Sequence, residues 1–150
     1  MTDGSYAGRQ PGVSARAGRP QRRGPTVLLV DPNLDGTRPL AAALYRVCDV
    51  AVVRSAQEAF AAMEARLPDL VVTELDLPDA PGVEFITRVH RAPATYHVLL
   101  LVMTSRHSVR DKIAAFQAGA DDFLVKPVDP RDFVNHVHLL SRFQRIIGRG

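Results

Sequence analysis

The sequence has only one cysteine, Cys48, and no long run of apolar residues. A single cysteine excludes an internal disulfide and suits a reducing compartment, so we expect a cytoplasmic protein. The longest apolar run, residues 98–103, is far shorter than the roughly 20 residues that span a bilayer, so we expect no membrane segment. The amino-terminal residues also lack the apolar centre of a secretory signal.

Acidic residues are scarce at the amino-terminal end. Residues 1–25 carry five arginines and one acid, Asp3, and have almost nothing to bury. We predict a disordered basic tail over residues 1–25 and one domain over 26–150, a length that buries its own core. The tail accounts for the high pI, because the remaining residues are close to neutral. It could contact nucleic acid or a lipid surface, but a solvated linker is the simpler interpretation.

Apolar, β-branched segments alternate along the chain with segments of helical periodicity. The expected strands are 27–30, 49–53, 70–73, 98–103 and 123–125. The expected helices follow Thr37, Ser55, Gly82, Ser108 and Asp129. Thr37 is the expected N-cap of the first helix, because Pro39 suits only a first turn. Ser55 and Glu58 have the spacing of a capping box. Alternating strands and helices favour a doubly wound α/β fold with a parallel sheet.

Polar residues follow four of these strands, and they are Asp31, Glu74, Thr104 and Lys126. The carboxyl ends of parallel strands lie along one edge of the sheet, where open α/β sheets bind ligands. We therefore expect the four side chains to converge there. Asp76 lies in the loop after the third strand, close to Glu74. The five histidines lack the spacing of metal ligands.

Four segments carry a family resemblance: VLLVD (27–31), PDLVVTELDLP (68–78), LLLVMTS (99–105) and AGADDFLVKP (118–127). They resemble the receiver domain of bacterial two-component response regulators, of the chemotaxis-regulator kind. The resemblance covers about residues 26–147. It implies a flavodoxin-like sheet of five parallel strands in the order 2-1-3-4-5, and a part in phosphorelay signal transduction.

In this family an aspartate after the third strand accepts a phosphoryl group from a histidine kinase. The resemblance gives Asp31 the role of a metal-binding acid, Thr104 that of the switch hydroxyl and Lys126 that of the cation on the phosphoryl group. Phe123 stands at the switch aromatic position, where it is either a switch or a core residue. Metal and lysine would neutralise the charge of the phosphoryl group in transfer.

Two positions depart from the family pattern. Glu74 replaces the acceptor aspartate, and its extra methylene displaces the carboxylate from the position for in-line attack. Pro32 replaces the second acid after the first strand. We therefore expect Mg²⁺ binding to be weakened, with Asp31, Glu74 and Asp76 as the candidate ligands.

Three hypotheses follow. The first is a pseudo-receiver that acts by protein–protein contact without aspartate phosphorylation, and it is not an enzyme. The second is a working phosphoacceptor that uses Glu74 or, as a lesser alternative, Asp76. The third, a minor one, is a nucleic-acid or membrane binder that uses its arginine tail. Lys126 and Glu74 could also form an ion pair that only stabilises the fold.

Partners also follow from the resemblance. Receivers usually present the face formed by their fourth helix, fifth strand and fifth helix. We expect a histidine kinase or a downstream effector to bind there, or a second copy of the chain to form a homodimer. No output domain follows within these residues, so we expect either a single-domain regulator or an effector that is a separate protein.

Overall fold

The computed structural model describes residues 24–143. Its strands are β1 (Thr26–Val30), β2 (Asp49–Val53), β3 (Leu70–Thr73), β4 (Leu99–Thr104) and β5 (Asp122–Val125). Its helices are α1 (Leu34–Tyr45), α2 (Ala56–Ala65), α3 (Gly82–Arg91), α4 (Val109–Ala118) and α5 (Pro130–Phe143). The strands form one parallel sheet in the order β2-β1-β3-β4-β5. This confirms the predicted doubly wound, flavodoxin-like fold.

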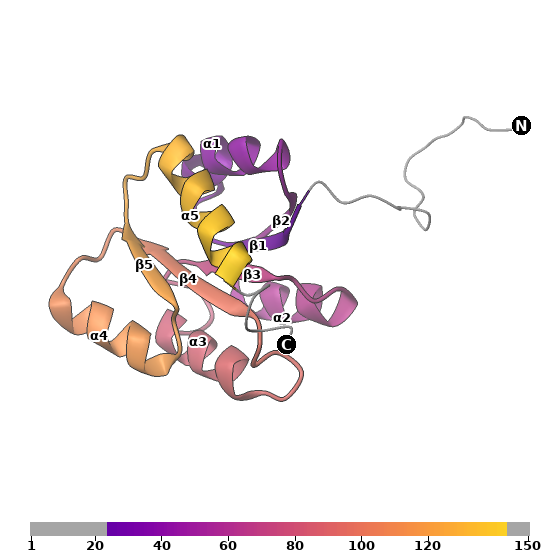
Figure 1. Cartoon of the computed structure of the whole chain (residues 1–150). Helices are drawn as coiled ribbons and strands as arrows, with labels where there is room; N and C mark the ends of the chain where they lie inside the picture. Colours follow the sequence, from indigo (N-terminus) through magenta and orange to yellow (C-terminus); the bar gives the residue numbers. More distant parts are fainter. Residues whose placement is uncertain (1–23, 144–150) are drawn as a thin grey trace, which may run out of the picture.

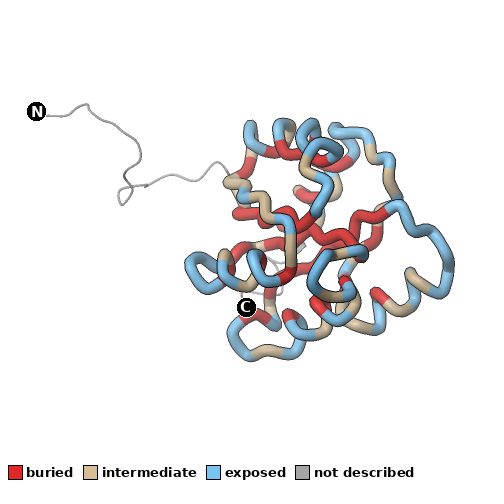
Figure 2. The backbone as a smooth tube through the Cα atoms, turned by 180° about the vertical axis from the view of Figure 1, so that it is seen from behind, coloured by how far each residue is buried: buried red, intermediate tan, exposed pale blue. Residues whose placement is uncertain are grey.

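Helices cover both faces of the sheet, with α1 and α5 on one side and α2, α3 and α4 on the other (Figure 1). Alternate residues of each strand face opposite layers. In β1, Leu28 and Val30 join the core on the α2–α3–α4 side, whereas Val27 and Leu29 join the core under α1 and α5. The central strands are buried along their length (Figure 2). Burial on both faces explains their continuous apolar sequences.

The predicted start of the first helix is wrong. Helix α1 begins at Leu34, and Asn33 rather than Thr37 is its N-cap, because the Asn33 side chain accepts a hydrogen bond from Gly36 N. The Thr37 hydroxyl instead donates to backbone carbonyls in the same turn. Pro39 lies inside the helix and is exposed. The polar cap at Asn33 therefore fixes the start of the helix, and the proline does not.

The other predicted helix ends are close to those observed. Ser55 accepts from Glu58 N as the capping box requires, but the Glu58 carboxylate returns to Arg54 N rather than to Ser55 N. Asp129 accepts from the first backbone N–H groups of α5. Gly119 ends α4 with φ 130°, a conformation that favours glycine.

Strand β4 lies one residue later than predicted, and the other strands agree to within one residue. Residues 1–23 of the predicted basic tail lie outside the described residues, as do residues 144–150 at the carboxyl end of the predicted domain. Both boundaries stay predictions. Within the described part of the chain, no helix has the length and apolar character needed to cross a membrane.

Candidate functional site

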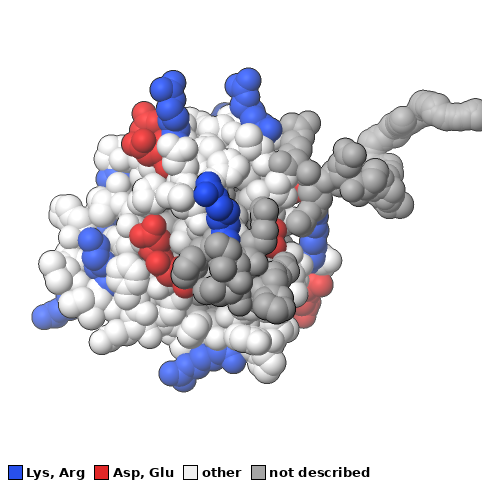
Figure 3. Space-filling model, viewed as in Figure 1, with Lys and Arg blue, Asp and Glu red and all other residues white. Residues whose placement is uncertain are grey.

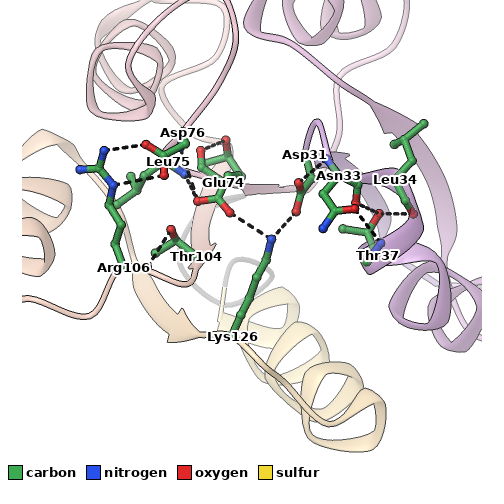
Figure 4. Close-up of polar contacts among 12 residues, drawn as sticks. Asp31, Asn33, Leu34, Thr37, Glu74, Leu75, Asp76, Thr104, Arg106 and Lys126 are labelled. Carbon is green, nitrogen blue, oxygen red and sulfur yellow. Dashed lines mark hydrogen bonds and ion pairs between the residues drawn. The ribbon is translucent and has the colours of Figure 1, made fainter.

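The carboxyl edge of the sheet brings together an ammonium group and two carboxylates from three strands (Figure 4). Lys126 follows β5, and its Nζ lies 2.7 Å from Asp31 Oδ2 and 3.0 Å from Glu74 Oε1. Asp31 follows β1 and Glu74 follows β3. The ends of β1 and β3 are neighbours because these strands pair, and Lys126 reaches them from β5 across the end of β4, which pairs with both β3 and β5. The order of the strands in the sheet therefore brings the side chains together, although 95 residues separate Asp31 from Lys126.

The cluster is largely shielded from water. The side chains of Asp31 and Glu74 are only 4% and 9% exposed, and that of Lys126 is 23% exposed. Burial acts to lower the pKa of Lys126, but its hydrogen bonds to the two carboxylates outweigh burial, and the pKa lies above its usual range. The ammonium is thus held in its charged form between two acids.

The second oxygen of Glu74 is also occupied. Its Oε2 accepts hydrogen bonds from Leu75 N at 2.7 Å and from Asp76 N at 3.4 Å. The carboxylate therefore contacts Lys126 through one oxygen and its own loop through the other. A glutamate can reach back in this way because of its additional methylene. Both oxygens serve internal contacts rather than facing an incoming group.

The loop between β3 and α3 is anchored at its far end. Gly82 N donates to Leu75 O at 2.8 Å, and a Cβ on Gly82 would lie only 2.8 Å from Glu74 O. Asp79 accepts hydrogen bonds from Ala56 N and Gln57 N. These bonds lower the pKa of Asp79, and the bond from Gln57 N contributes most. Asp79 therefore fastens the loop to the start of α2 and takes no part in the ionic cluster.

Asp76 pairs with an arginine that the sequence prediction missed. Arg106 donates to both carboxylate oxygens, with Nη2 2.6 Å from Oδ1 and Nε 3.2 Å from Oδ2. Its Nη1 lies 3.5 Å from Asp111 Oδ1, in the first turn of α4. These contacts, led by the hydrogen bond to Asp76, raise the pKa of Arg106 further. Arg106 lies two residues after Thr104 in the sequence, but that spacing does not indicate a pairing with Asp76.

Thr104 is buried and lies beside the arginine. Its hydroxyl accepts from Arg106 N at 3.3 Å. Phe123 is 8% exposed and packs in the core on the α4 side. The centroids of the Phe123 and Phe116 rings are 6.4 Å apart. Lys112 Nζ lies 5.7 Å from the centroid of the Phe123 ring. Phe123 is therefore a core residue in this structure, and whether it also acts as a switch stays a prediction.

The predicted metal ligands do not form a set that fits Mg²⁺. Mg²⁺ takes a near-octahedral shell of oxygens at about 2.1 Å. Lys126 already holds one oxygen each of Asp31 and Glu74, and Arg106 holds both oxygens of Asp76. Across residues 24–143 no group of three or more histidine, cysteine, aspartate or glutamate side chains is placed to hold a metal ion.

A parallel sheet of this order, with a lysine and acids at its carboxyl edge, defines a receiver-type signalling domain. Residues 27–138 match the response regulator receiver domain, and the chain belongs to that family, whose members act in two-component signalling. Histidine kinases and effectors are the general partners of such domains.

Relatives with curated names include two transcriptional regulatory proteins. TrcR of Mycobacterium tuberculosis is 34% identical over 136 residues, which is 90% of this chain and 51% of TrcR. BasR of Escherichia coli is 44% identical over 90 residues, which is 60% of this chain and 40% of BasR. The chain thus spans about half the length of these relatives or less.

Solved structures give the same architecture. A candidate response regulator of Chloroflexus aurantiacus is 30% identical with a TM-score of 0.72, over 79% of this chain and 98% of that one. A CheY-like receiver domain from Methanospirillum hungatei has a TM-score of 0.75 at 24% identity, over 81% of this chain and 96% of that one. The second likeness supports the fold alone.

Proposed function

We propose that this chain is a pseudo-receiver, a binding module of two-component signalling that works without aspartate phosphorylation and without enzymatic activity of its own. The observation that carries the proposal is the engagement of Glu74. One of its oxygens contacts Lys126 and the other accepts from its own loop. Attack on phosphorus needs a carboxylate oxygen that can turn a lone pair toward the incoming group, and these contacts orient both oxygens of Glu74 inward and lower their nucleophilicity.

The position of Pro32 supports the same proposal. Receivers use a second acid there to help hold Mg²⁺, which neutralises charge during phosphoryl transfer. Pro32 has no side-chain oxygen to offer as a ligand, and it lines a cavity with Leu75 and Pro78 instead. Mg²⁺ could reach Asp31, Glu74 and Asp76 only if these carboxylates left Lys126 and Arg106, so we propose that any Mg²⁺ binding is weak and that the module works without it.

We propose that protein partners bind the face formed by α4, β5 and α5. Helix α4 exposes an apolar stripe at helical spacing, consisting of Val109, Ile113 and Phe116. Val125 on β5 and Leu139 on α5 are also exposed. Such side chains can desolvate against a histidine kinase, an effector or a second copy of the chain. A homodimer is one form of this contact.

Binding to nucleic acid or membrane is the weaker alternative. On the face that Figure 3 shows, the basic side chains are scattered and interspersed with acidic ones rather than gathered in one patch. The names of TrcR and BasR describe transcriptional regulators, but this chain spans only about half of each or less. We propose cytoplasmic localisation from the single cysteine and the signalling role.

The test is phosphoryl incorporation. The purified chain would be incubated with Mg²⁺ and acetyl phosphate, and intact mass would be measured beside a Glu74→Asp variant. We expect no adduct on the wild-type chain. An adduct on Glu74→Asp alone would identify Glu74 as the residue that disables acceptance.

The competing hypothesis makes the opposite prediction. An added phosphoryl mass on the wild-type chain would overturn the pseudo-receiver proposal. Peptide mapping would then assign the adduct to Glu74 or to Asp76 and establish a working phosphoacceptor, which a histidine kinase could phosphorylate within a phosphorelay.

A further inference from the structure

Arg106 lies on the rim of the cavity that Pro32 lines. The cavity has a volume of about 640 Å³, and its charged rim includes Asp76, Asp79, Arg106 and Asp111. The guanidinium donates to both oxygens of Asp76 in the loop after β3, and its Nη1 lies 3.5 Å from Asp111 Oδ1 in the first turn of α4. One side chain therefore joins this loop to α4.

The same loop connects Arg106 to the nearly buried carboxylate of Glu74 (Figure 4). The side chain of Asp76 accepts from the guanidinium, and its backbone N–H donates to Glu74 Oε2 at 3.4 Å. Leu75 N donates to the same oxygen at 2.7 Å. Glu74 thus positions the peptide segment that carries Asp76, and the contacts run without interruption from the Glu74 carboxylate to the first turn of α4.

We propose that Arg106 is a positioning residue that couples the carboxylate of Glu74 to helix α4. Through Asp76 the loop after β3 holds the guanidinium, and the guanidinium holds the first turn of α4 at Asp111. A change at Glu74 therefore alters how firmly the start of α4, and the apolar stripe that follows it, is held. The inference rests on the proposed function for its consequence, because that stripe belongs to the proposed binding face.

The contacts of Thr104 support a route through the arginine. The Thr104 hydroxyl accepts a hydrogen bond from Arg106 N at 3.3 Å, and within residues 24–143 it forms no hydrogen bond with Glu74. The hydroxyl that the family pattern makes the switch is thus bonded to Arg106 instead. Arg106 therefore contacts the end of β4, the loop after β3 and the start of α4.

Geometry and exposure determine how strong the coupling is. A guanidinium that donates to both oxygens of one carboxylate is held in a fixed orientation. The pKa of Arg106 is raised mainly by its hydrogen bond to Asp76, and the charge of Glu74 adds to the effect. The side chains of Arg106 and Asp76 are 49% and 57% exposed, so solvent screens their attraction. The coupling is therefore a few-fold effect on local opening.

Amide hydrogen exchange of α4, resolved by nuclear magnetic resonance, tests the coupling. The reporter is Lys112 N–H, which donates to Ser108 O and closes the first turn. Protection factors correct for the intrinsic exchange rate of each sequence. The variants are Arg106→Ala, Glu74→Gln and the two combined. The matched control is Arg110→Ala, which removes the same charge from an exposed position on α4.

We expect Arg106→Ala to lower the protection factor of Lys112 N–H about threefold, the size of an exposed ion-pair contribution to local opening. Arg110→Ala should match the wild type. Glu74→Gln should lower the same protection factor about twofold, because a neutral amide holds the loop N–H groups less strongly than a carboxylate does. Added to Arg106→Ala, Glu74→Gln should cause no further loss, since the connection to α4 is already absent.

Two results would overturn the proposal. The first is equal protection of Lys112 N–H in Arg106→Ala and Arg110→Ala. The second is a loss caused by Glu74→Gln that is equally large with and without Arg106, because a merely structural effect of Glu74 would reach α4 by another route.

Asp76→Asn repeats the test from the loop, at an exposed position that does not depend on the stability of the Lys126 cluster. Alone it should reproduce the loss of Arg106→Ala, and combined with Arg106→Ala it should add nothing; additive losses would contradict the pairing. Thermal unfolding verifies that each variant is folded. A phosphoryl adduct on the wild-type chain would remove the proposed function but leave this exchange comparison intact, so the two failures are distinguishable.

Discussion

The candidate site contains two cations that each bind two carboxylates, yet their surroundings differ. Lys126 joins Asp31 and Glu74, whose side chains are at most 9% exposed. Arg106 joins Asp76 and Asp111, and the arginine itself is about half exposed. The Lys126 contacts tie the ends of three strands, whereas the Arg106 contacts tie two loops and the first turn of a helix.

This difference separates a structural contact from an adjustable one. A charge pair in low dielectric is costly to break, because each partner is left unsolvated. An exposed pair can separate at a small cost in free energy, because water solvates both charges once they are apart. The same number of opposite charges therefore fixes the sheet edge at Lys126 and forms a weaker, solvent-screened contact at Arg106.

The largest expected effect comes from Lys126→Met, which keeps an unbranched side chain only one atom shorter and removes its charge. Asp31 and Glu74 would then be two unpaired carboxylates that are nearly buried. We expect the free energy of unfolding to fall by about 3 kcal/mol, the lower end for loss of one partner of a buried ion pair. Urea unfolding at neutral pH measures it.

The matched control is Lys126→Met combined with Glu74→Gln, which removes one of the two unpaired charges. This double variant should regain a substantial part of the lost stability. If Lys126→Met were as stable as the wild type, the cluster would not be the structural contact that its burial indicates.

A second, smaller effect concerns alkaline pH. The pKa of Lys126 is raised in the folded chain, so its contribution to stability is fully present below the unfolded pKa. The contribution is lost as pH rises through the folded pKa, above about pH 10. Thermal unfolding from pH 8 to 11 should show this loss in the wild type. The loss should be smaller in Lys126→Met, and equal slopes would contradict the assignment.

A third effect sharpens the comparison through Asp79, which anchors the loop that Glu74 and Asp76 share. Its lowered pKa means that its contribution is present above the unfolded pKa and is lost as pH falls through the folded pKa. Asp79→Asn should lower the Tm less than Lys126→Met and should weaken the dependence of Tm on acidic pH. The expected cause is that a neutral amide accepts weaker hydrogen bonds from Gln57 N and Ala56 N than the Asp79 carboxylate does. If the dependence of Tm on acidic pH were the same in Asp79→Asn as in the wild type, Asp79 would not anchor the loop in this way.

Much of the fold could be predicted because it depends on local patterns. The apolar runs of β1 and β3 and the acids that follow them place Asp31 and Glu74 at one edge once the strands are parallel. The start of α1 was mispredicted because Pro39 is tolerated inside the helix, whereas the Asn33 side chain caps the first turn. An asparagine side chain that caps its own turn is a stronger signal than the position of an exposed proline.

The cavity rim could not be predicted in the same way. Arg106 follows Thr104 in a polar segment without periodicity, and nothing in its spacing indicates which acid it meets. Its pairing with Asp76 depends on how the loops after β3 and β4 approach one another. The family resemblance made Asp76 a candidate metal ligand, whereas the structure gives both of its oxygens to an arginine.

The smallest expected effect is that of Arg106→Ala on stability, and salt makes it a test of the comparison. At low ionic strength the variant should be slightly less stable than the wild type, because Asp76 and Asp111 lose their shared cation. At 1 M NaCl the Debye length falls to about 3 Å, so the difference should vanish. The loss caused by Lys126→Met should persist in the same salt, because solvent ions have little access to Asp31 and Glu74. Chemical unfolding with urea, which leaves ionic strength unchanged, suits both measurements. If the two variants responded to salt alike, burial would not be what distinguishes the two cations.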